Sequence, residues 1–452
     1  ESYATLPAII WAQALDHARR RGDYIEENKI GLILAVNVAS LPGNLALTLA
    51  LVLISEITDL PVVCLNQAFY WQNDSNYPQC VRSAIDFFKN QHLDEVFSIV
   101  EQLFPWQSPL WLHANISNGQ SSHLIEKMGV CPANVITLPT VVDTEQFSPK
   151  TAKEKSAIRR KLAAVFSSSS TLPISRAARD FCPATDPLHK PVILGAEKGL
   201  SVAFDETTLL LLQPTRPTPQ RCVERDLSFL FHFVKSPQLA AGFGEDTIRQ
   251  IVLLVSGGVT AGCERYFEDL CLQVKKLFQQ LPAEFKNRVF VAFAHGVARS
   301  LPAAEHARID LPTVSDLYNG ADLVLLPSKT EGRGLPLMEA AASAVPIMAA
   351  HFGPEAVYRQ VIGSEETKNR RLRLLPFPEA EDETNEQMDR QAHAAEDAIG
   401  AVLDPAVREA LQQHNLQVAR ARFSMQVLIP AWQKIFSPMP LFHSLSHPSR
   451  QQ

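Results

Sequence analysis

The sequence predicts an α/β protein with two doubly wound, Rossmann-like parallel sheets, and two observations carry this prediction. Short apolar runs recur along the chain with helical stretches between them, which is the alternation expected of parallel strands covered by helices. The chain has 452 residues, of which 46% are hydrophobic and 20% are charged. That length exceeds what one small core organises, so we expect two domains.

The candidate strands fall into two groups of four. They are Leu32–Val36, Val62–Leu65, Leu110–Ala114 and Val135–Leu138, then Leu209–Leu212, Ile251–Val255, Val289–Phe293 and Leu323–Leu326. Between the groups, residues 151–191 mix charges, serines and prolines, which indicates a linker with a mobile insertion. The alternative is an integral helical layer built on a helix at Lys155–Phe166.

The expected domain organisation follows from these runs. It comprises an N-terminal domain over 1–150, the linker or insertion over 151–191, a C-terminal domain over 192–413, a last helix over 414–438, and a tail over 439–452. We expect the last helix to run from His414 to Phe436.

Composition excludes several classes of function. A net charge of −6 and a pI near 6.1, with basic residues scattered along the chain, give no reason to expect nucleic acid. Seven cysteines without a C-x-x-C pair argue against a disulfide framework and a zinc cluster, and favour a reducing compartment. The apolar run from Leu32 to Ile54 is broken at Pro42-Gly43, so we expect no transmembrane segment and a cytoplasmic protein.

The most informative segment runs from Pro327 to Glu355. It places Glu331 and Glu339 around a turn bracketed by Gly332 and Gly334, where a helix begins. Glycines let a backbone approach a ligand, and the N–H groups of a helix start favour a diphosphate. Carboxylates accept sugar hydroxyls, so we expect Glu339 to hold a ribose and Glu331 a hexose. The alternative is an ordinary strand–loop–helix unit with surface glutamates.

This segment resembles the retaining glycosyltransferases of the two-domain GT-B fold, in particular the large E-x7-E group that includes sucrose-phosphate synthases and bacterial mannosyltransferases. Glu331 and Glu339 match the two glutamates of its signature. The likeness continues through Asp316, Leu317, Tyr318, Ala321, Asp322, Pro327, Ser328 and from Pro346 to Glu355. It implies two Rossmann-like domains facing across a cleft, with a nucleoside-diphosphate sugar bound by the C-terminal one. It also implies that the last helix, over 414–438, crosses back to the N-terminal domain.

Two arginines are candidates to neutralise the leaving diphosphate. Arg216 and Arg221 follow the Leu209–Leu212 strand, and ligands of open parallel sheets lie beyond the carboxyl ends of strands. The family has an Arg and a Lys in this loop, so Arg221 resembles a replacement of the Lys. With two cations and no carboxylate cluster, we expect no metal and no other cofactor. Alternatively, both are surface residues of a proline-rich loop.

Further donor contacts are expected from loops at the same sheet edge. The resemblance places the nucleobase beside His295-Gly296-Val297, although a lone His at a strand end is more often structural. The expected donor-binding set is Glu339, Gly332, Arg333, Gly334, Leu335, Gly258, His295, Gly296 and Val297, with Glu331, Arg216 and Arg221 as the catalytic set.

The N-terminal half departs from the family pattern. Val36 stands where relatives have a His, and Asn66-Gln67 replace titrating residues ahead of Tyr70. The glycine-rich loop that opens relatives is missing, which favours a fragment or an abbreviated domain. Asn66, Gln67 and Tyr70 are nevertheless expected to form an acceptor subsite, since amides and aromatics bind sugars. The alternative places the aromatics in the core.

The resemblance implies a retaining transfer of a hexose to the hydroxyl of a small molecule or glycan, in which donor phosphate helps deprotonate the acceptor. Two alternatives remain. One is a weak or inactive homologue that binds nucleotide sugars as a regulatory or scaffolding subunit, and the other is a sugar phosphorylase of the same fold.

Overall fold

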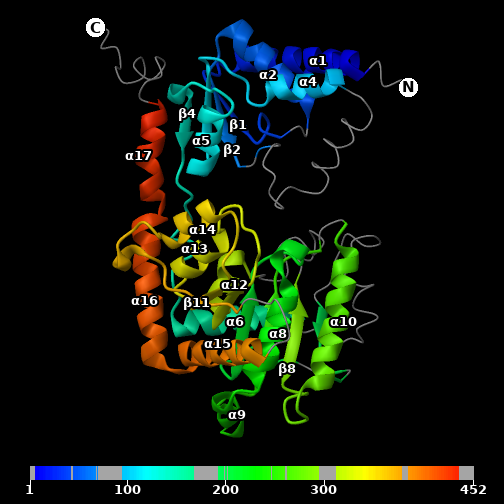
Figure 1. The fold of residues 1–452 in the computed structure, drawn as a ribbon, viewed down its shortest axis with the longest axis vertical. Helices are drawn as coiled ribbons and strands as arrows, with labels where there is room; N and C mark the ends of the chain where they lie inside the picture. The colour runs from blue at the N-terminus through cyan, green and yellow to red at the C-terminus, as the bar shows by residue number, and fades with distance from the viewer. Residues whose placement is uncertain are drawn as a thin grey trace. The chain divides into compact units, whose positions relative to one another are not determined.

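A computed structural model describes most of the chain, and its residues fall into two compact units (Figure 1). The described residues are 6–41, 44–67, 69, 94–166, 192–197, 199–200, 202–245, 247–259, 262–294, 312–378 and 385–436. Unit 1 comprises Glu1–Thr140 with Gln426–Gln452, and unit 2 comprises Val141–Met425.

Unit 1 contains a four-stranded parallel sheet in the order β1-β2-β3-β4. Its strands are β1 (Ile33–Val36), β2 (Val62–Asn66), β3 (Trp111–Asn115) and β4 (Val135–Thr137). All four agree with the expected strands to within about one residue at either end. Because every strand is parallel to its neighbours, the four carboxyl ends meet at one edge of the sheet.

Helices cover one face of this sheet and supply most of the core of unit 1. They are α1 (Leu6–Glu27), α2 (Leu45–Thr58) and α4 (Asp94–Leu103), while α5 (Asn118–Glu126) and the short turn η2 (Pro132–Asn134) lead into β4. The side chain of Asn44 caps α2 by accepting a hydrogen bond from the Leu47 N–H at 2.9 Å. Apolar residues of α1, α2 and α4 pack on Ala35, Cys64 and Trp111 of the strands.

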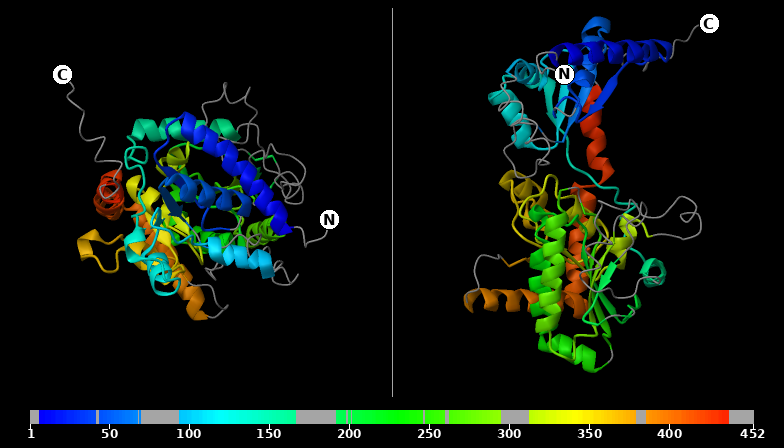
Figure 2. Two further views of the ribbon diagram at one scale, coloured as in Figure 1. Left: turned by 90° about the horizontal axis from the view of Figure 1, so that it is seen from above. Right: turned by 90° about the vertical axis from the view of Figure 1, so that its right-hand side faces the viewer.

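The C-terminal helix α17 (Met425–Phe436) belongs to unit 1, although the whole of unit 2 precedes it in the chain. Leu428, Ala431 and Trp432 of α17 pack against a cluster that includes Val63 and Ala114, on the sheet face opposite α1 and α2. The right-hand view of Figure 2 shows this helix, in red, beside the strands.

Unit 2 contains a seven-stranded sheet in the order β11-β10-β9-β6-β7-β8-β5. The strands are β5 (Val192–Leu194), β6 (Thr208–Gln213), β7 (Gln250–Val255), β8 (Val289–Phe293), β9 (Leu323–Leu326), β10 (Ile347–Ala349) and β11 (Leu375–Pro376). Only the edge strand β5 is antiparallel to its neighbour. β6, β7, β8 and β9 match the four expected strands of this half.

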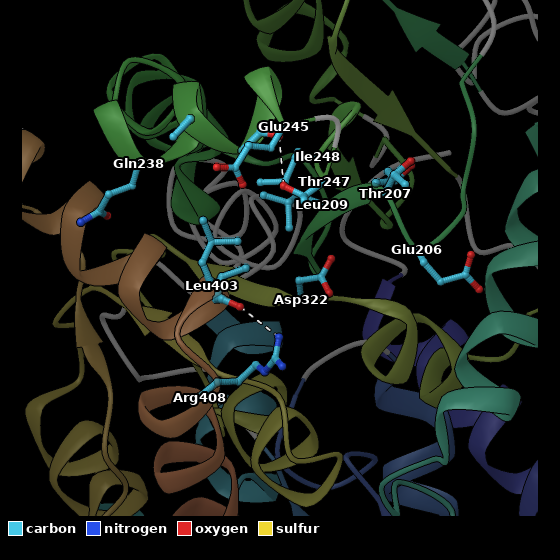
Figure 3. A pocket seen from close by; sticks show the side chains of 14 residues that line it. Glu206, Thr207, Leu209, Gln238, Glu245, Thr247, Ile248, Asp322, Leu403 and Arg408 are labelled. Atoms are coloured by element: carbon cyan, nitrogen blue, oxygen red, sulfur yellow. Dashed lines mark hydrogen bonds between the residues drawn. The ribbon is translucent and has the colours of Figure 1, made fainter.

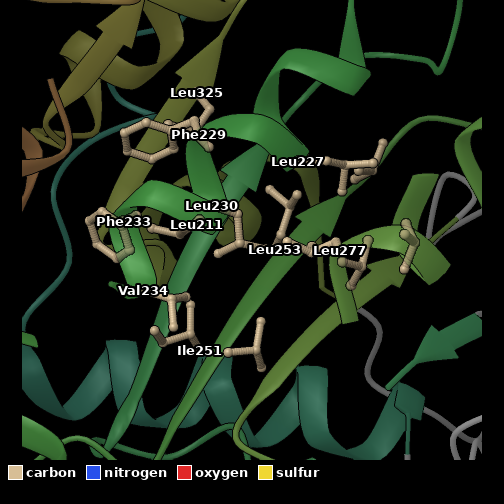
Figure 4. Close-up of a cluster of buried hydrophobic side chains, with 14 of the residues drawn as sticks. Leu211, Leu227, Phe229, Leu230, Phe233, Val234, Ile251, Leu253, Leu277 and Leu325 are labelled. Atoms are coloured by element: carbon tan, nitrogen blue, oxygen red, sulfur yellow. The ribbon is translucent and has the colours of Figure 1, made fainter. Parts of the chain in front are cut away.

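Side chains alternate between the two faces of this sheet, as the strand period requires. Leu211, Leu253 and Leu325 pack against α8 (Val223–Val234), α9 (Pro237–Gly244), α10 (Glu264–Gln280) and α15 (Asn385–Leu403) (Figure 4). Their sequence neighbours face α6 (Ala152–Phe166), α12 (Val314–Gly320), α13 (Leu335–Ala342), α14 (Glu355–Ile362) and α16 (Pro405–Arg422). Two short turns, η3 (Pro219–Arg221) and η4 (Lys368–Arg370), complete the described elements of unit 2.

Two segments differ from expectation. In place of a linker, residues 152–166 form α6, whose Leu162 and Phe166 lie in the core of unit 2, while residues 167–191 lie outside the described part of the chain. The expected single last helix is two helices, because α16 ends at Arg422 and α17 begins at Met425. The chain thus passes from unit 2 to unit 1 at this break.

Among the described helices, none combines the length and the apolar character needed to cross a membrane.

Candidate functional site

The expected donor residues of unit 2 converge at the carboxyl edge of its sheet. β6, β7 and β9 are parallel neighbours, so the loops that follow them emerge side by side. These loops carry Arg216 and Arg221 after β6, Gly258 after β7, and Glu331 after β9. The sheet topology therefore places these loops at one edge, as the sequence predicted.

The loop after β9 is fixed by backbone hydrogen bonds on both sides. The Lys329 N–H donates to Gln220 O at 2.9 Å, and the Glu331 N–H donates to Gly353 O at 2.9 Å. α13 then begins at Leu335, with Pro336 as its second residue. No side chain caps this helix start. Pro336 has no N–H and the Leu337 N–H donates to Gly334 O at 3.0 Å, so among its first three residues Leu335 alone has an N–H that no described backbone hydrogen bond uses.

Gly334 requires the absence of a side chain for two reasons. Its φ of 64° lies in the left-handed region, which favours glycine. A Cβ there would lie 2.9 Å from Cγ2 of Val361 in α14. The turn that brings the chain from Glu331 to α13 is thus specified by glycine.

Glu331 and Arg221 form an ion pair. The Arg221 guanidinium donates from Nη1 to Oε1 of Glu331 and also to Thr330 O at 3.0 Å. The side chain of Glu331 is 3% exposed, whereas that of Arg221 is 27% exposed. Because Arg221 is partly exposed and Glu331 is buried behind it, a ligand that reaches this ion pair contacts the arginine first.

Glu339 lies one turn into α13 and has a partner that the sequence did not predict. Tyr318 of α12 donates its hydroxyl proton to Oε2 of Glu339 at 2.7 Å. Burial raises the pKa of Glu339, and the Tyr318 hydrogen bond opposes that shift. Burial and the Glu339 charge raise the pKa of Tyr318 as well, so the phenol stays a donor. Tyr318 therefore orients the carboxylate proposed for the ribose.

The loop after β6 is pressed against the loop after β7. A Cβ at Gly257 would lie 2.4 Å from the Cα of Arg216, so the two backbones touch where only glycine fits. Arg216 itself is exposed, and Gly258 is buried. The contact fixes the backbone from which the Arg216 guanidinium extends.

Three polar groups of the Ser328–Arg333 segment have no hydrogen-bond partner among the described residues. They are the hydroxyls of Ser328 and Thr330 and the Nε of Arg333. Burial lowers the pKa of Arg333. These buried groups therefore have hydrogen-bonding capacity that the described residues do not use.

Several expected residues lie outside the described part of the chain. These are His295, Gly296 and Val297 of the proposed nucleobase loop, and Tyr70 of the proposed acceptor subsite. Asn66 and Gln67 are described and lie at the carboxyl edge of the sheet in unit 1.

Asn66 does not present its side chain to solvent. It is 1% exposed, and its Nδ2 donates to Oδ1 of Asn115 at 3.0 Å. His113 Nε2 lies 3.0 Å from Trp106 O, and since a carbonyl only accepts, Nε2 carries the proton and Nδ1 accepts from Asn66 at 3.5 Å. Burial lowers the pKa of His113, which favours this neutral form.

The network continues across the edge of unit 1 through neutral groups. Asn115 donates to Ser121 Oγ at 3.0 Å, and Ser121 pairs with Thr137 at 2.7 Å. The Gln67 N–H donates to Oδ1 of Asn37 at 2.7 Å, while the Gln67 side chain is exposed. Of the two amides expected to bind an acceptor, Gln67 alone has a side chain free of the buried network.

A separate cavity of about 420 Å³ lies at the opposite edge of the sheet in unit 2, where β6 and β9 begin (Figure 3). Leu209, Ile248, Asp322 and Arg408 are among its lining residues. Asp322 is paired with Arg159 at 2.8 Å. None of the expected donor residues lines this cavity, so it is distinct from the donor edge.

Within the described ranges, no group of three or more His, Cys, Asp or Glu side chains is arranged to hold a metal ion.

Comparisons with known protein families and with curated proteins found no sequence match. Solved structures do resemble the chain. HepE from Anabaena, in complex with UDP and glucose, has a TM-score of 0.52 at 13% identity, covering 93% of this chain and 81% of HepE. A glycosyltransferase from Rickettsia africae has a TM-score of 0.50 at 11% identity, covering 94% and 82%. Sucrose-phosphate synthase from Thermosynechococcus elongatus has a TM-score of 0.50 at 14% identity, covering 98% and 79%.

These similarities confirm the predicted fold class. The chain is an α/β protein with the GT-B fold, built of two units with parallel sheets.

Proposed function

We propose that the chain is a retaining glycosyltransferase, which moves a hexose from a nucleoside-diphosphate sugar to an acceptor hydroxyl. The observation that carries this proposal is the Arg221–Glu331 ion pair beside the uncapped start of α13, with Glu339 one turn further on. Guanidinium and helix N–H groups bind phosphate oxygens, and carboxylates accept sugar hydroxyls. A protein of the same fold, HepE, has been solved in complex with UDP-glucose, which supports the proposed donor class.

The residues divide the donor between them. Arg216 and Arg221 neutralise the diphosphate, Glu331 holds the hexose, and Glu339 holds the ribose. The backbone of Gly332–Leu335 and of Gly258 contacts the phosphates, and His295, Gly296 and Val297 contact the base. The ion pair between Arg221 and Glu331 supports one further detail of this proposal, in which Arg221 links the hexose subsite to the phosphate subsite.

The transfer we propose occurs on one face of the sugar. The bond between the anomeric carbon and the phosphate oxygen breaks, the bond to the acceptor oxygen forms, and the acceptor proton passes to the departing phosphate. Arg216 and Arg221 stabilise the charge that develops on that phosphate. No protein nucleophile is needed in this scheme.

The test is a panel of UDP-, GDP- and ADP-sugars, scored by calorimetric binding and by donor turnover with and without a panel of acceptors. We expect one base to bind and at least one acceptor to be glycosylated with retained anomeric configuration. Formation of a sugar 1-phosphate from inorganic phosphate would identify a phosphorylase instead. Failure of every nucleotide to bind would overturn the proposed donor site.

The second candidate is a weak or inactive homologue that binds the donor as a regulatory or scaffolding subunit. The neutral edge of unit 1 favours it, because Asn66 and His113 are hydrogen-bonded to other protein groups. Donor binding without transfer to any acceptor would select this candidate.

We also propose that the reaction needs no divalent metal, because Arg216 and Arg221 supply the charge that a metal would otherwise supply. Activity should survive EDTA treatment followed by dialysis. Loss of activity that manganese or magnesium restores would contradict this proposal.

A cytoplasmic location remains part of the proposal. Five cysteines in the described ranges are free thiols, which agrees with a reducing compartment, namely Cys64, Cys131, Cys222, Cys263 and Cys271.

A further inference from the structure

Two neighbouring residues of α8, Arg225 and Asp226, lie beneath the donor edge of unit 2. Arg225 is 9% exposed and Asp226 is fully buried. Burying an ionisable side chain costs desolvation free energy unless it forms hydrogen bonds or ion pairs, so the contacts of these two residues indicate what they contribute. Each of the two reaches a different donor loop.

Arg225 holds the loop that follows β9. Its Nη1 donates to Pro327 O at 2.8 Å and its Nη2 to Pro378 O at 2.6 Å. The guanidinium also lies over the Phe377 ring, 5.2 Å from its centroid. Pro327 is the first residue after β9, four residues before Glu331. The rigid guanidinium fork thus fixes where this loop leaves the sheet.

Asp226 holds the loop that follows β6, through one intermediary. Its Oδ2 accepts from Nε2 of Gln213 at 3.0 Å. This bond sets the orientation of the Gln213 amide, whose Oε1 then accepts from the Thr215 N–H at 3.2 Å and from the Thr215 hydroxyl at 3.0 Å. Thr215 precedes Arg216, at the point where the backbone touches Gly257.

The Asp226 carboxyl has an unusual environment. Its Oδ1 has no partner among the described residues, and within the same residues Gln213 is the one hydrogen-bond donor to this carboxyl. Burial raises the pKa of Asp226 well above its usual range. The nearby charges are Glu224 and Arg225 of its own helix, which act in opposite directions, while Gln213 of β6 is uncharged. Burying a carboxyl costs more desolvation free energy than burying an apolar side chain. The bond to Gln213 is the structural contribution that offsets this cost.

We propose that Arg225 and Asp226 are positioning residues, which set the two donor loops of unit 2 from a single helix: Arg225 through Pro327, and Asp226 through Gln213 and Thr215. This inference rests on the proposed donor site. Neither side chain touches the donor; each acts on the backbone that carries Glu331 or Arg216.

Hydrogen exchange of the intact chain tests the positioning itself, without any ligand. We expect Asp226→Leu, which keeps the number and branching of the side-chain heavy atoms and removes the acceptor, to speed exchange in peptides that contain Thr215. Asp226→Asn keeps an acceptor for Gln213 and should restore protection. Arg225→Met, which keeps the stem and removes the fork, should speed exchange around Lys329 and Glu331. Asn415→Ala serves as the control. It removes a buried side chain that is hydrogen-bonded to the Arg373 backbone and to neither donor loop.

Calorimetry with UDP and GDP then links position to binding. We expect Asp226→Leu and Arg225→Met each to weaken nucleotide binding about tenfold, whereas Asp226→Asn and Asn415→Ala stay near the parent. Thermal unfolding of every variant separates a loss of loop order from a loss of fold.

The outcomes are distinguishable. Unchanged exchange at Thr215 in Asp226→Leu, or equal effects of Asp226→Leu and Asn415→Ala on both loops, would overturn the positioning roles. If the parent chain binds no nucleotide while Asp226→Leu still speeds exchange at Thr215 and Asp226→Asn restores it, the positioning stands and the proposed donor function fails.

Discussion

The carboxyl edges of the two sheets are built from opposite kinds of side chain. In unit 2 the edge carries acidic and basic side chains, among them Arg221, Glu331 and Glu339. In unit 1 the corresponding edge carries amides, hydroxyls and a neutral imidazole, including Asn66 and His113. Both edges belong to parallel sheets, so the backbone architecture does not cause the difference.

The two edges differ in which polar groups lack a hydrogen-bond partner. Unit 1 pairs most of these polar groups with one another, from Asn66 through Asn115 and Ser121 to Thr137, and leaves Oδ1 of Asn66 without a partner among the described residues. Unit 2 leaves donors unsatisfied, at Ser328, Thr330 and Arg333 among the residues described. An unpaired donor such as the Arg333 Nε is suited to an anion, whereas the unpaired atom of the unit 1 network is the Asn66 amide oxygen, which only accepts. This contrast agrees with the proposal that unit 2 binds the donor, and the following predictions test it.

The largest expected effect is that of Arg221→Ala. This change removes a cation that we propose neutralises the leaving diphosphate. It also leaves Glu331 buried without its ion-pair partner. We expect kcat/KM to fall by about 10²–10³-fold in a transfer assay with the preferred donor. Arg221→Lys, which restores charge without the planar fork, should recover part of the loss. Full activity in the alanine variant would remove the charged edge from the mechanism.

The next effect separates the two glutamates of the same edge. Glu339→Ala should weaken free UDP or GDP binding by about 1–3 kcal/mol, since the ribose hydroxyls lose a charged partner. Glu331→Ala should spare the free nucleotide and impair the intact sugar donor. Calorimetry with both ligands measures this, and equal losses for free nucleotide in both variants would contradict the assigned roles. Tyr318→Phe is a useful companion, because it removes only the hydroxyl that orients Glu339.

A third prediction concerns the neutral edge of unit 1. Asn66→Ala should lower the free energy of unfolding by about 1–3 kcal/mol, because Asn115 and His113 each lose a buried partner. Nucleotide affinity should stay at the parental value. Gln67→Ala should have little effect on the free energy of unfolding in urea. If the exposed Gln67 side chain lies in the acceptor subsite, this variant should instead transfer less sugar to the acceptor. Identical behaviour of the two variants would show that the edge has a single role.

The smallest expected effect is a pH dependence from His113. Burial lowers its pKa in the folded chain, so below about pH 6.5 the unfolded chain binds a proton that the folded chain resists. Stability contributed by the neutral ring is therefore present above that pH and is lost as pH falls, by about 1.4 kcal/mol per pH unit until the folded pKa is reached. His113→Gln should flatten this decline in urea titrations between pH 7 and 5. An unchanged slope would mean that other groups cause the acid sensitivity.

Sequence patterns predicted the sheet strands well where they were long and apolar. β6, β7, β8 and β9 were found because buried parallel strands are continuous apolar runs. β5, β10 and β11 were missed, since strands of two or three residues carry too little pattern to identify them. The break between α16 and α17 was missed because the apolar pattern continues across it.

Site residues were predictable when they lay close together in sequence and unpredictable when their partners were distant. Glu331 and Glu339 share one loop–helix unit, so spacing alone associates them. Asn66 was expected to face an acceptor, yet its partner Asn115 is 49 residues away, and burial of this pair depends on strand register. The Tyr318 contact to Glu339 likewise depends on packing between α12 and α13.

The place of α17 in the chain sets the order in which the units can be completed during biosynthesis. A ribosome makes α17 only after all of unit 2, although the helix belongs to unit 1. At 5–20 residues per second, roughly 15–60 s separate the synthesis of Thr140 from that of α17. Throughout that interval the cluster of Val63, Ala114 and Leu138 lacks its covering helix. The nascent chain therefore presents an apolar surface that a chaperone can shield until the last helix arrives.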